Sequence, residues 1–114
     1  MARKRVLVVD DELPVRELLG NMLTHLGHSW EAACNVTEAL SKIESTEFDL
    51  VLTDLNMPGT NGVELAREIK RRNPETPVIL MTGSQLQNPS PDIDDVLRKP
   101  FSAQQLRELI ASFT

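Results

Sequence analysis

Residues 6–11 read Val-Leu-Val-Val-Asp-Asp, four apolar residues followed at once by two acidic ones. Two later stretches repeat this design, with apolar residues 50–52 before Thr53-Asp54 and apolar residues 78–81 before Thr82. Short continuous apolar runs are typical of strands that are buried on both faces of a parallel sheet. The three runs therefore predict the central strands of such a sheet.

Between these runs the apolar residues follow helical spacing. In the first predicted helix, Pro14 suits the first turn and Gly27 suits the C-terminal stop. Its predicted buried face consists of Val15, Leu18, Leu19, Met22, Leu23 and Leu26. The same spacing predicts three more helices, with apolar faces in residues 36–43, 65–69 and 106–113. Asn35 with Glu38, and Ser102 with Gln105, are placed to cap two of them.

Two more polar segments, residues 29–33 and 95–98, are predicted to be edge strands because they carry fewer apolar side chains. Alternating strands and helices imply a parallel sheet with helices on both faces. With the apolar strands at the centre, the predicted strand order is 2-1-3-4-5, which is the flavodoxin-like, doubly wound α/β fold. We expect residues 1–114 to form a single domain, since the sequence shows no repeat, low-complexity tract or linker.

Composition excludes several classes of protein. A net charge of −5 gives no overall attraction to nucleic acid. A single cysteine, Cys34, excludes an intramolecular disulfide and a cysteine-based zinc cage. The chain has no apolar stretch near the roughly 20 residues that span a bilayer, and no signal peptide at its start. The sequence therefore predicts a cytoplasmic protein.

Polar side chains follow the ends of four predicted strands: Asp10 and Asp11, then Asp54, Thr82 and Lys99. The carboxyl ends of parallel strands meet at one edge of the sheet, so these side chains should lie together. Crowded carboxylates disfavour joint ionisation, and Mg²⁺ with its preference for oxygen ligands would relieve this. No His or Cys is expected at this edge, which argues against zinc. An acidic residue after a strand is also often a helix cap, so only the combination of strand ends favours a site.

Such a site could support phosphoryl transfer. An ionised Asp54 beside Mg²⁺ can attack phosphorus and form an acyl phosphate. The metal ion and Lys99 would neutralise the charge of the transferred group.

These residues resemble the receiver domain of two-component response regulators over nearly the whole chain. The resemblance depends on four motifs: Val8-Val9-Asp10-Asp11-Glu12, Asp54-Leu55-Asn56-Met57-Pro58-Gly59-Thr60-Asn61-Gly62, Met81-Thr82-Gly83 and Lys99-Pro100-Phe101.

The resemblance implies that Asp54 accepts phosphate from a histidine kinase or a phosphotransfer protein, in a signalling switch that catalyses only its own phosphorylation and dephosphorylation. It implies a Mg²⁺ site made by Asp10, Asp11, Asp54 and the backbone carbonyl of Asn56. It further implies that Thr82 and Lys99 contact phosphoryl oxygens, that the Lys99-Pro100 peptide is cis, and that a downstream protein or fused effector domain receives the signal.

Two features depart from the family pattern. Val96 stands where the family usually has an aromatic switch residue that responds to the position of Thr82. The segment between Thr82 and Lys99 has only sixteen residues and contains Pro89 and Pro91, which cannot lie inside a helix without breaking hydrogen bonds. We therefore expect the fourth helix of the family to be absent, or reduced to a turn or two around residues 85–88.

Two other functions remain open. An interaction module that keeps the fold without phosphorylation is compatible with Val96. A phosphohydrolase with an aspartyl nucleophile is disfavoured, because Asn56 replaces the second Asp that such enzymes use as acid and base. His25 and His28 are predicted to be surface residues.

Overall fold

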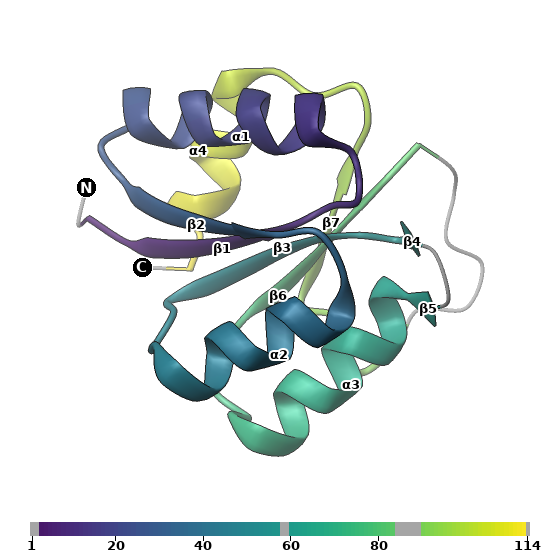
Figure 1. The fold of residues 1–114 in the computed structure, drawn as a ribbon. Helices are drawn as coiled ribbons and strands as arrows, with labels where there is room; N and C mark the ends of the chain where they lie inside the picture. The colour runs from purple at the N-terminus through teal and green to yellow at the C-terminus, as the bar shows by residue number, and fades with distance from the viewer. Residues whose placement is uncertain (1–2, 58–59, 84–89, 114) are drawn as a thin grey trace.

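The computed structural model describes residues 3–57, 60–83 and 90–113, and Figure 1 shows the path of the chain. In chain order the elements are β1 (Arg5–Val9), α1 (Leu13–His25), β2 (Ser29–Ala33), α2 (Val36–Ser45), β3 (Leu50–Asp54), β4 (Asn56–Met57), β5 (Thr60–Asn61), α3 (Gly62–Arg72), β6 (Val78–Thr82), β7 (Asp95–Arg98) and α4 (Ala103–Ala111).

Five strands form one parallel sheet in the order β2-β1-β3-β6-β7. Every residue of β3 and β6 is buried, whereas β2 and β7 each bury one residue. The most apolar strands are therefore central and the polar ones form the edges, because a central strand has neighbours on both sides and helices on both faces. The predicted flavodoxin-like fold and strand order are confirmed.

Helices cover both faces of the sheet. Figure 1 shows α1 and α4 on one face and α2 and α3 on the other. The buried side chains divide in the same way: Leu19, Leu23, Leu106 and Ile110 belong to one cluster, and Ala39, Ile43, Leu65 and Ile69 to the other. No helix in the described ranges is long and apolar enough to cross a membrane.

Two expectations about single residues are wrong. Leu18 was placed on the buried face of α1 by its spacing, but it is 55% exposed, because it lies at the margin of the apolar stripe. His28, expected at the surface, is buried directly before β2, where its Nδ1 accepts a hydrogen bond from the Lys4 backbone N–H. The stop of α1 is as predicted, since Gly27 has a φ of 91°.

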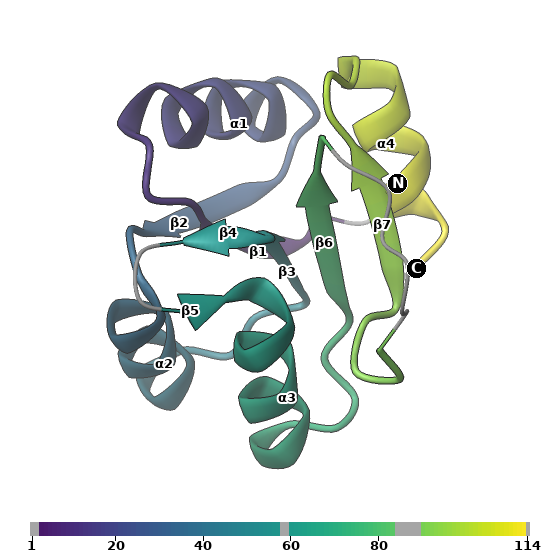
Figure 2. The ribbon, with the colours of Figure 1, turned by 90° about the vertical axis from the view of Figure 1, so that its right-hand side faces the viewer.

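The connection after β3 contains a feature that the sequence did not indicate. β4 and β5 pair antiparallel as a separate two-stranded ribbon, and Figure 2 shows β5 below β4 and leading into α3. The expectation of a shortened or missing fourth helix concerns residues 84–89, which lie outside the described ranges.

Trp30 fixes α1 against the sheet. Its indole ring lies over Gly20, and its Nε1 donates a hydrogen bond of 3.0 Å to Thr24 Oγ1. A Cβ atom at Gly20 would lie 2.1 Å from Trp30 Cζ2, well inside any van der Waals contact. A glycine is therefore needed at this position of the helix so that the ring can approach the backbone.

Gly20→Ala should consequently destabilise the protein by about 2 kcal/mol, the usual cost of overpacking, although alanine is the better helix former. Urea unfolding followed by the fluorescence of Trp30, the only tryptophan, measures the effect. Ser41→Ala, at an exposed position on α2, is the control and should leave the midpoint unchanged. An unaltered midpoint in Gly20→Ala would show that the ring does not lie on this glycine.

Candidate functional site

Polar side chains from four neighbouring strands meet at the carboxyl edge of the sheet. Asp54 ends β3, Thr82 ends β6, and Asp10 and Lys99 directly follow β1 and β7. Lys99 Nζ lies 3.2 Å from Asp54 Oδ1 and 3.5 Å from Asp10 Oδ2. The sheet thus brings together residues that are up to 89 positions apart in sequence, Asp10 and Lys99.

Asp10 is completely buried, and both its main chain and one of its carboxylate oxygens form hydrogen bonds. Its N–H donates to the Ala33 carbonyl at 3.1 Å, and its Oδ1 accepts from the Glu12 N–H at 2.9 Å. Its Oδ2 is buried and accepts no hydrogen bond from any residue in the described ranges. Oδ1 is therefore fixed by a hydrogen bond, whereas Oδ2 has only the longer ion-pair contact with Lys99 and can accept a further ligand.

Negative charge accumulates at this edge. Burial raises the pKa of the Asp10 carboxyl, and the Asp54 and Asp11 carboxylates raise it further, while the Glu12 N–H and Lys99 lower it. One carboxylate oxygen each from Asp10, Asp11 and Glu12 lie within 4.8 Å of one another. Lys99 contacts Asp10 and Asp54, but its one positive charge does not balance these carboxylates, so the arrangement suits a divalent cation.

Glu12 was not predicted as part of this group. The cluster of three carboxylates consists of Asp10, Asp11 and Glu12, so the third member comes from the same short connection as the first two. The sequence did contain a signal for Glu12, because this acidic residue directly follows Asp11. Asp54 enters the same edge from β3, and its side chain is largely buried, with the whole residue 8% exposed.

The backbone around Asp54 is held by close packing with the start of α3. The Gly62 N–H donates to the Leu55 carbonyl at 2.8 Å, and the Leu55 N–H donates to the Met81 carbonyl at 3.0 Å. A Cβ atom at Gly62 would lie 2.4 Å from the Asp54 carbonyl oxygen. Gly62 therefore permits the close approach that sets the direction of the Asp54 backbone. Asn56, the predicted source of a backbone ligand, lies in β4 opposite Asn61.

Thr82 and Lys99 are joined through their main chains. The Lys99 N–H donates to the Thr82 carbonyl at 2.8 Å, and Thr82 is 2% exposed. The peptide between Lys99 and Pro100 is cis, as predicted. Val96 lies in β7 opposite Leu80 and is half-buried. The two residues assigned to the switch position, Thr82 and Val96, are thus on adjacent strands.

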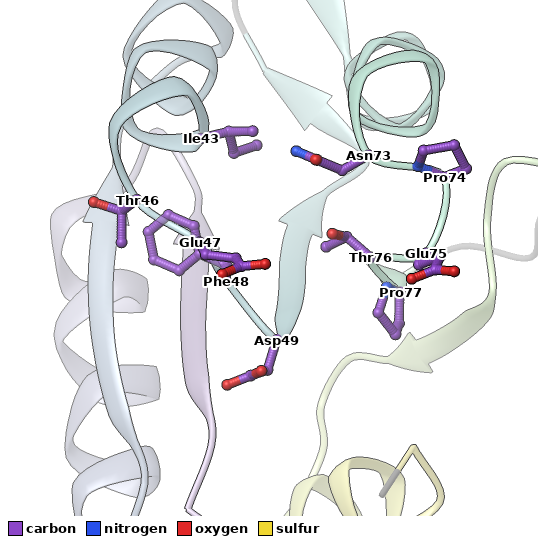
Figure 3. Close-up of a pocket in the computed structure, with 10 residues that line it drawn as sticks. All are labelled: Ile43, Thr46, Glu47, Phe48, Asp49, Asn73, Pro74, Glu75, Thr76 and Pro77. Atoms are coloured by element: carbon purple, nitrogen blue, oxygen red, sulfur yellow. The ribbon is translucent and has the colours of Figure 1, made fainter.

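A pocket of about 490 Å³ opens at the opposite, amino-terminal edge of the sheet. Figure 3 shows its lining, which includes Ile43 and Phe48 from the α2 side and Pro74 and Pro77 from the segment after α3. None of the residues predicted for the site lines it. The pocket and the polar edge therefore lie at opposite ends of the strands.

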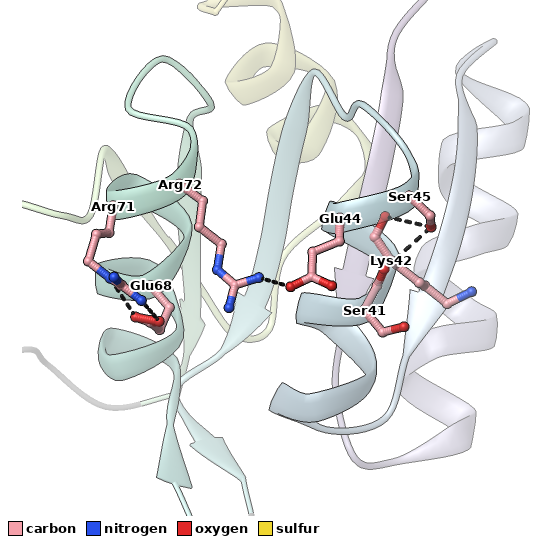
Figure 4. Close-up of polar contacts among 7 residues, drawn as sticks. All are labelled: Ser41, Lys42, Glu44, Ser45, Glu68, Arg71 and Arg72. Atoms are coloured by element: carbon pink, nitrogen blue, oxygen red, sulfur yellow. Dashed lines mark hydrogen bonds and ion pairs between the residues drawn. The ribbon is translucent and has the colours of Figure 1, made fainter.

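The basic stretch at the end of α3 is paired with carboxylates. Lys70 Nζ lies 2.6 Å from Asp94 Oδ2, and Arg71 lies 2.6 Å from Glu68 Oε1. Arg72 forms an ion pair with Glu44 of α2, which Figure 4 shows together with the pair between Arg71 and Glu68. Arg72 thus links α3 to α2, whereas Arg71 pairs within α3 and Lys70 pairs with the segment before β7. Because each cation has a carboxylate partner, this stretch is not an uncompensated basic patch.

The sequence pattern of the family described as the response regulator receiver domain matches residues 6–111. The chain belongs to this family. Its members are phospho-acceptor switches of two-component systems, and the predicted resemblance is confirmed.

Among its curated relatives, this receiver domain is 37% identical to the response regulator protein PilR of Pseudomonas aeruginosa, over 98% of the chain and 26% of PilR. It is 36% identical to the transcriptional regulatory protein ResD of Bacillus subtilis, over 90% of the chain and 44% of ResD. The chain thus spans between about a quarter and about half the length of these relatives.

Solved structures agree with the fold. The response regulator TrrA of Thermotoga maritima, in complex with Mg²⁺ and a beryllium fluoride, has a TM-score of 0.89 and 36% identity over 97% of this chain and 99% of that chain. TrrA in complex with the histidine kinase ThkA has a TM-score of 0.86 and 36% identity, over 96% of this chain and 97% of that chain.

Proposed function

We propose that this receiver domain is a signalling switch that is phosphorylated on Asp54 in a Mg²⁺-dependent reaction. The observation that carries the proposal is the contact of Lys99 with both Asp54 and Asp10, beside the carboxylates of Asp11 and Glu12. In this proposal Asp54 is the nucleophile, Lys99 is the cation that neutralises charge, and the neighbouring carboxylates supply oxygen ligands for the metal ion.

The donor set fits Mg²⁺. All candidate ligands are oxygens, and Asp10 Oδ2 is buried without a hydrogen-bond donor from the described residues. Asp10, Asp11 and Asp54, with the backbone carbonyl of Asn56, are the residues we assign to the ion, and Glu12 lies close enough to contribute. When bound, Mg²⁺ would neutralise charge on the phosphoryl oxygens and keep the carboxylates ionised.

In the transfer, a carboxylate oxygen of Asp54 attacks phosphorus and forms an acyl phosphate, while the bond from phosphorus to the donor's histidine nitrogen breaks. Lys99 can neutralise the negative charge that develops on the phosphoryl oxygens, because it already contacts Asp54. Thr82 lies on the adjacent strand, and we assign its hydroxyl to a phosphoryl oxygen. The added charge would shift the balance between two arrangements of this edge, which is the output of the switch.

The phosphodonor in this proposal is a histidine kinase or a histidine phosphotransfer protein, and TrrA bound to ThkA is the precedent among similar structures. A downstream protein, or an effector domain fused to residues 1–114, would receive the signal. We further propose that residues 1–114 act as one receiver unit in the cytoplasm, without direct contact with nucleic acid, and catalyse only their own phosphorylation and dephosphorylation.

Incubation with a small-molecule phosphodonor and Mg²⁺, followed by intact-mass measurement, tests the proposal. We expect one phosphoryl adduct per chain, labile to hydroxylamine as acyl phosphates are, and none when EDTA removes the metal. Failure to label while a known receiver domain labels in parallel would favour an interaction module. Turnover of a phosphomonoester would favour a phosphohydrolase.

A further inference from the structure

The connection between β1 and α1 carries three carboxylates in three residues, Asp10 to Glu12. Neighbouring carboxylates repel one another, so a connection this short needs contacts that hold it in one conformation. Those contacts decide where the oxygens of Asp10 and Asp11 lie.

A side-chain N-cap, which usually fixes the connection into a helix, is missing at α1. The N-cap side chains of the other helices in the described ranges, Asn35, Asn61 and Ser102, each accept a hydrogen bond from a backbone N–H of the first turn. Glu12, the N-cap residue of α1, makes no such bond. A capping bond contributes about 1 kcal/mol and fixes the entry of the chain into the helix.

Arg16 supplies a different link at this position. Its Nη1 donates a hydrogen bond of 2.7 Å to the backbone carbonyl of Asp10, and its own N–H donates to the Glu12 carbonyl at 3.1 Å. The side chain thus ties the first turn of α1 back to the residue that follows β1. The bond is made to the main-chain carbonyl of Asp10, so it does not occupy the carboxylate, whose Oδ2 stays directed to the site.

The main chain of Asp10 connects the Arg16 side chain with the end of β2. The Asp10 N–H in turn donates to the Ala33 carbonyl. Arg16 therefore sits where α1 and the ends of β1 and β2 meet.

We infer that Arg16 is a positioning residue for the metal ligands: its hydrogen bond to the Asp10 carbonyl replaces the missing helix cap and holds the carboxylates of Asp10 and Asp11 in the arrangement that binds Mg²⁺. The inference rests on the proposed function, because it presumes that these carboxylates take the ion. It adds a residue that neither contacts the phosphoryl group nor ligates the metal.

The direction of the change in Mg²⁺ affinity shows whether Arg16 acts through its hydrogen bond or through its charge. Arg16 is a cation near an anionic site, so its charge alone repels Mg²⁺, and removing that charge alone would tighten metal binding. Loss of the hydrogen bond, in contrast, lets the connection relax and weakens binding. Residues that hydrogen-bond to metal ligands without touching the metal typically contribute about tenfold or more to metal affinity.

The test is isothermal titration of Mg²⁺ into the protein without any phosphodonor. Arg16→Met keeps the aliphatic stem but loses the donor, and we expect its Mg²⁺ dissociation constant to rise by about tenfold. Arg16→Lys keeps the charge but lacks the planar, extended guanidinium, and we expect an intermediate value. Arg107→Met, at an exposed arginine of α4, removes the same charge elsewhere and should stay within about twofold of the parent, as expected for a screened surface charge.

Phosphorylation rates at increasing Mg²⁺ give the second readout. Arg16→Met should need more Mg²⁺ for half-maximal rate and should approach the parent rate at saturation, because Asp54 and Lys99 are untouched. Unfolding followed by Trp30 fluorescence confirms that each variant is folded. Unchanged or tighter Mg²⁺ binding in Arg16→Met would overturn the inference, whereas absence of Mg²⁺ binding by the parent protein would overturn the proposed function itself.

Discussion

Asp54→Asn should abolish the hydroxylamine-labile adduct completely. The amide that replaces the carboxylate has no ionised oxygen to attack phosphorus, although its size and its place at the end of β3 are unchanged. Its loss of charge also removes one partner of Lys99, which lies 3.2 Å from Asp54 Oδ1. Intact mass after incubation with phosphodonor and Mg²⁺ measures the result.

Asp49→Asn is the matched control for this prediction. Asp49 lies just before β3, at the opposite edge of the sheet, and its Oδ2 accepts a hydrogen bond from the Arg5 N–H. An asparagine there can still accept this bond through its amide oxygen, so the variant should label like the parent. A full adduct on Asp54→Asn would show that another side chain accepts the phosphoryl group.

Lys99→Met should slow phosphorylation about a hundredfold, which is the usual cost of removing one preorganised group that stabilises developing charge. Lys99 is the cation in contact with both Asp54 and Asp10. Methionine keeps most of the volume of the stem but cannot neutralise a phosphoryl oxygen. The initial rate of adduct formation at saturating Mg²⁺ measures this effect, and the final extent of labelling shows whether the acyl phosphate still forms.

Lys42→Met tests whether the loss of any lysine has this effect. Lys42 of α2 forms a comparable, half-exposed ion pair with Glu31 of β2 at 3.3 Å, away from the Asp54–Lys99 pair. Exposed pairs of this kind contribute little to stability, so the variant should keep the parent rate. If Lys99→Met phosphorylates as fast as Lys42→Met, charge neutralisation by Lys99 plays no part in the transfer.

Local patterns predicted most of the fold. The apolar runs at residues 6–9, 50–52 and 78–81 identified the central strands because burial on both faces demands continuous apolar sequence. The capping box of Ser102 and Gln105 marked the start of α4, since both of its hydrogen bonds are local. Leu18 shows where periodicity fails: a helical wheel cannot say how wide a stripe the neighbouring elements cover.

The candidate site was predictable for a related reason. Once strands are known to be parallel, the residues after them must share one edge, so Asp10, Asp54, Thr82 and Lys99 could be brought together without coordinates. Motif matching to receiver domains then gave each residue a role. The burial of His28 and the contact of Trp30 with Gly20 were not predictable, because each depends on partners from elements distant in sequence.

The order and type of residues along the chain determined which strands are central, which edge is polar and which chemistry that edge can support, because these follow from local periodicity and strand polarity. Only the tertiary structure decided how the edge is held. The bond from Arg16 to the Asp10 carbonyl, the approach of Gly62 to Asp54 and the position of Lys99 between two carboxylates are set by the packing of helices on the sheet. These contacts depend on how far each side chain extends toward a neighbouring element in the folded protein. The spacing of residues along the sequence does not specify this distance.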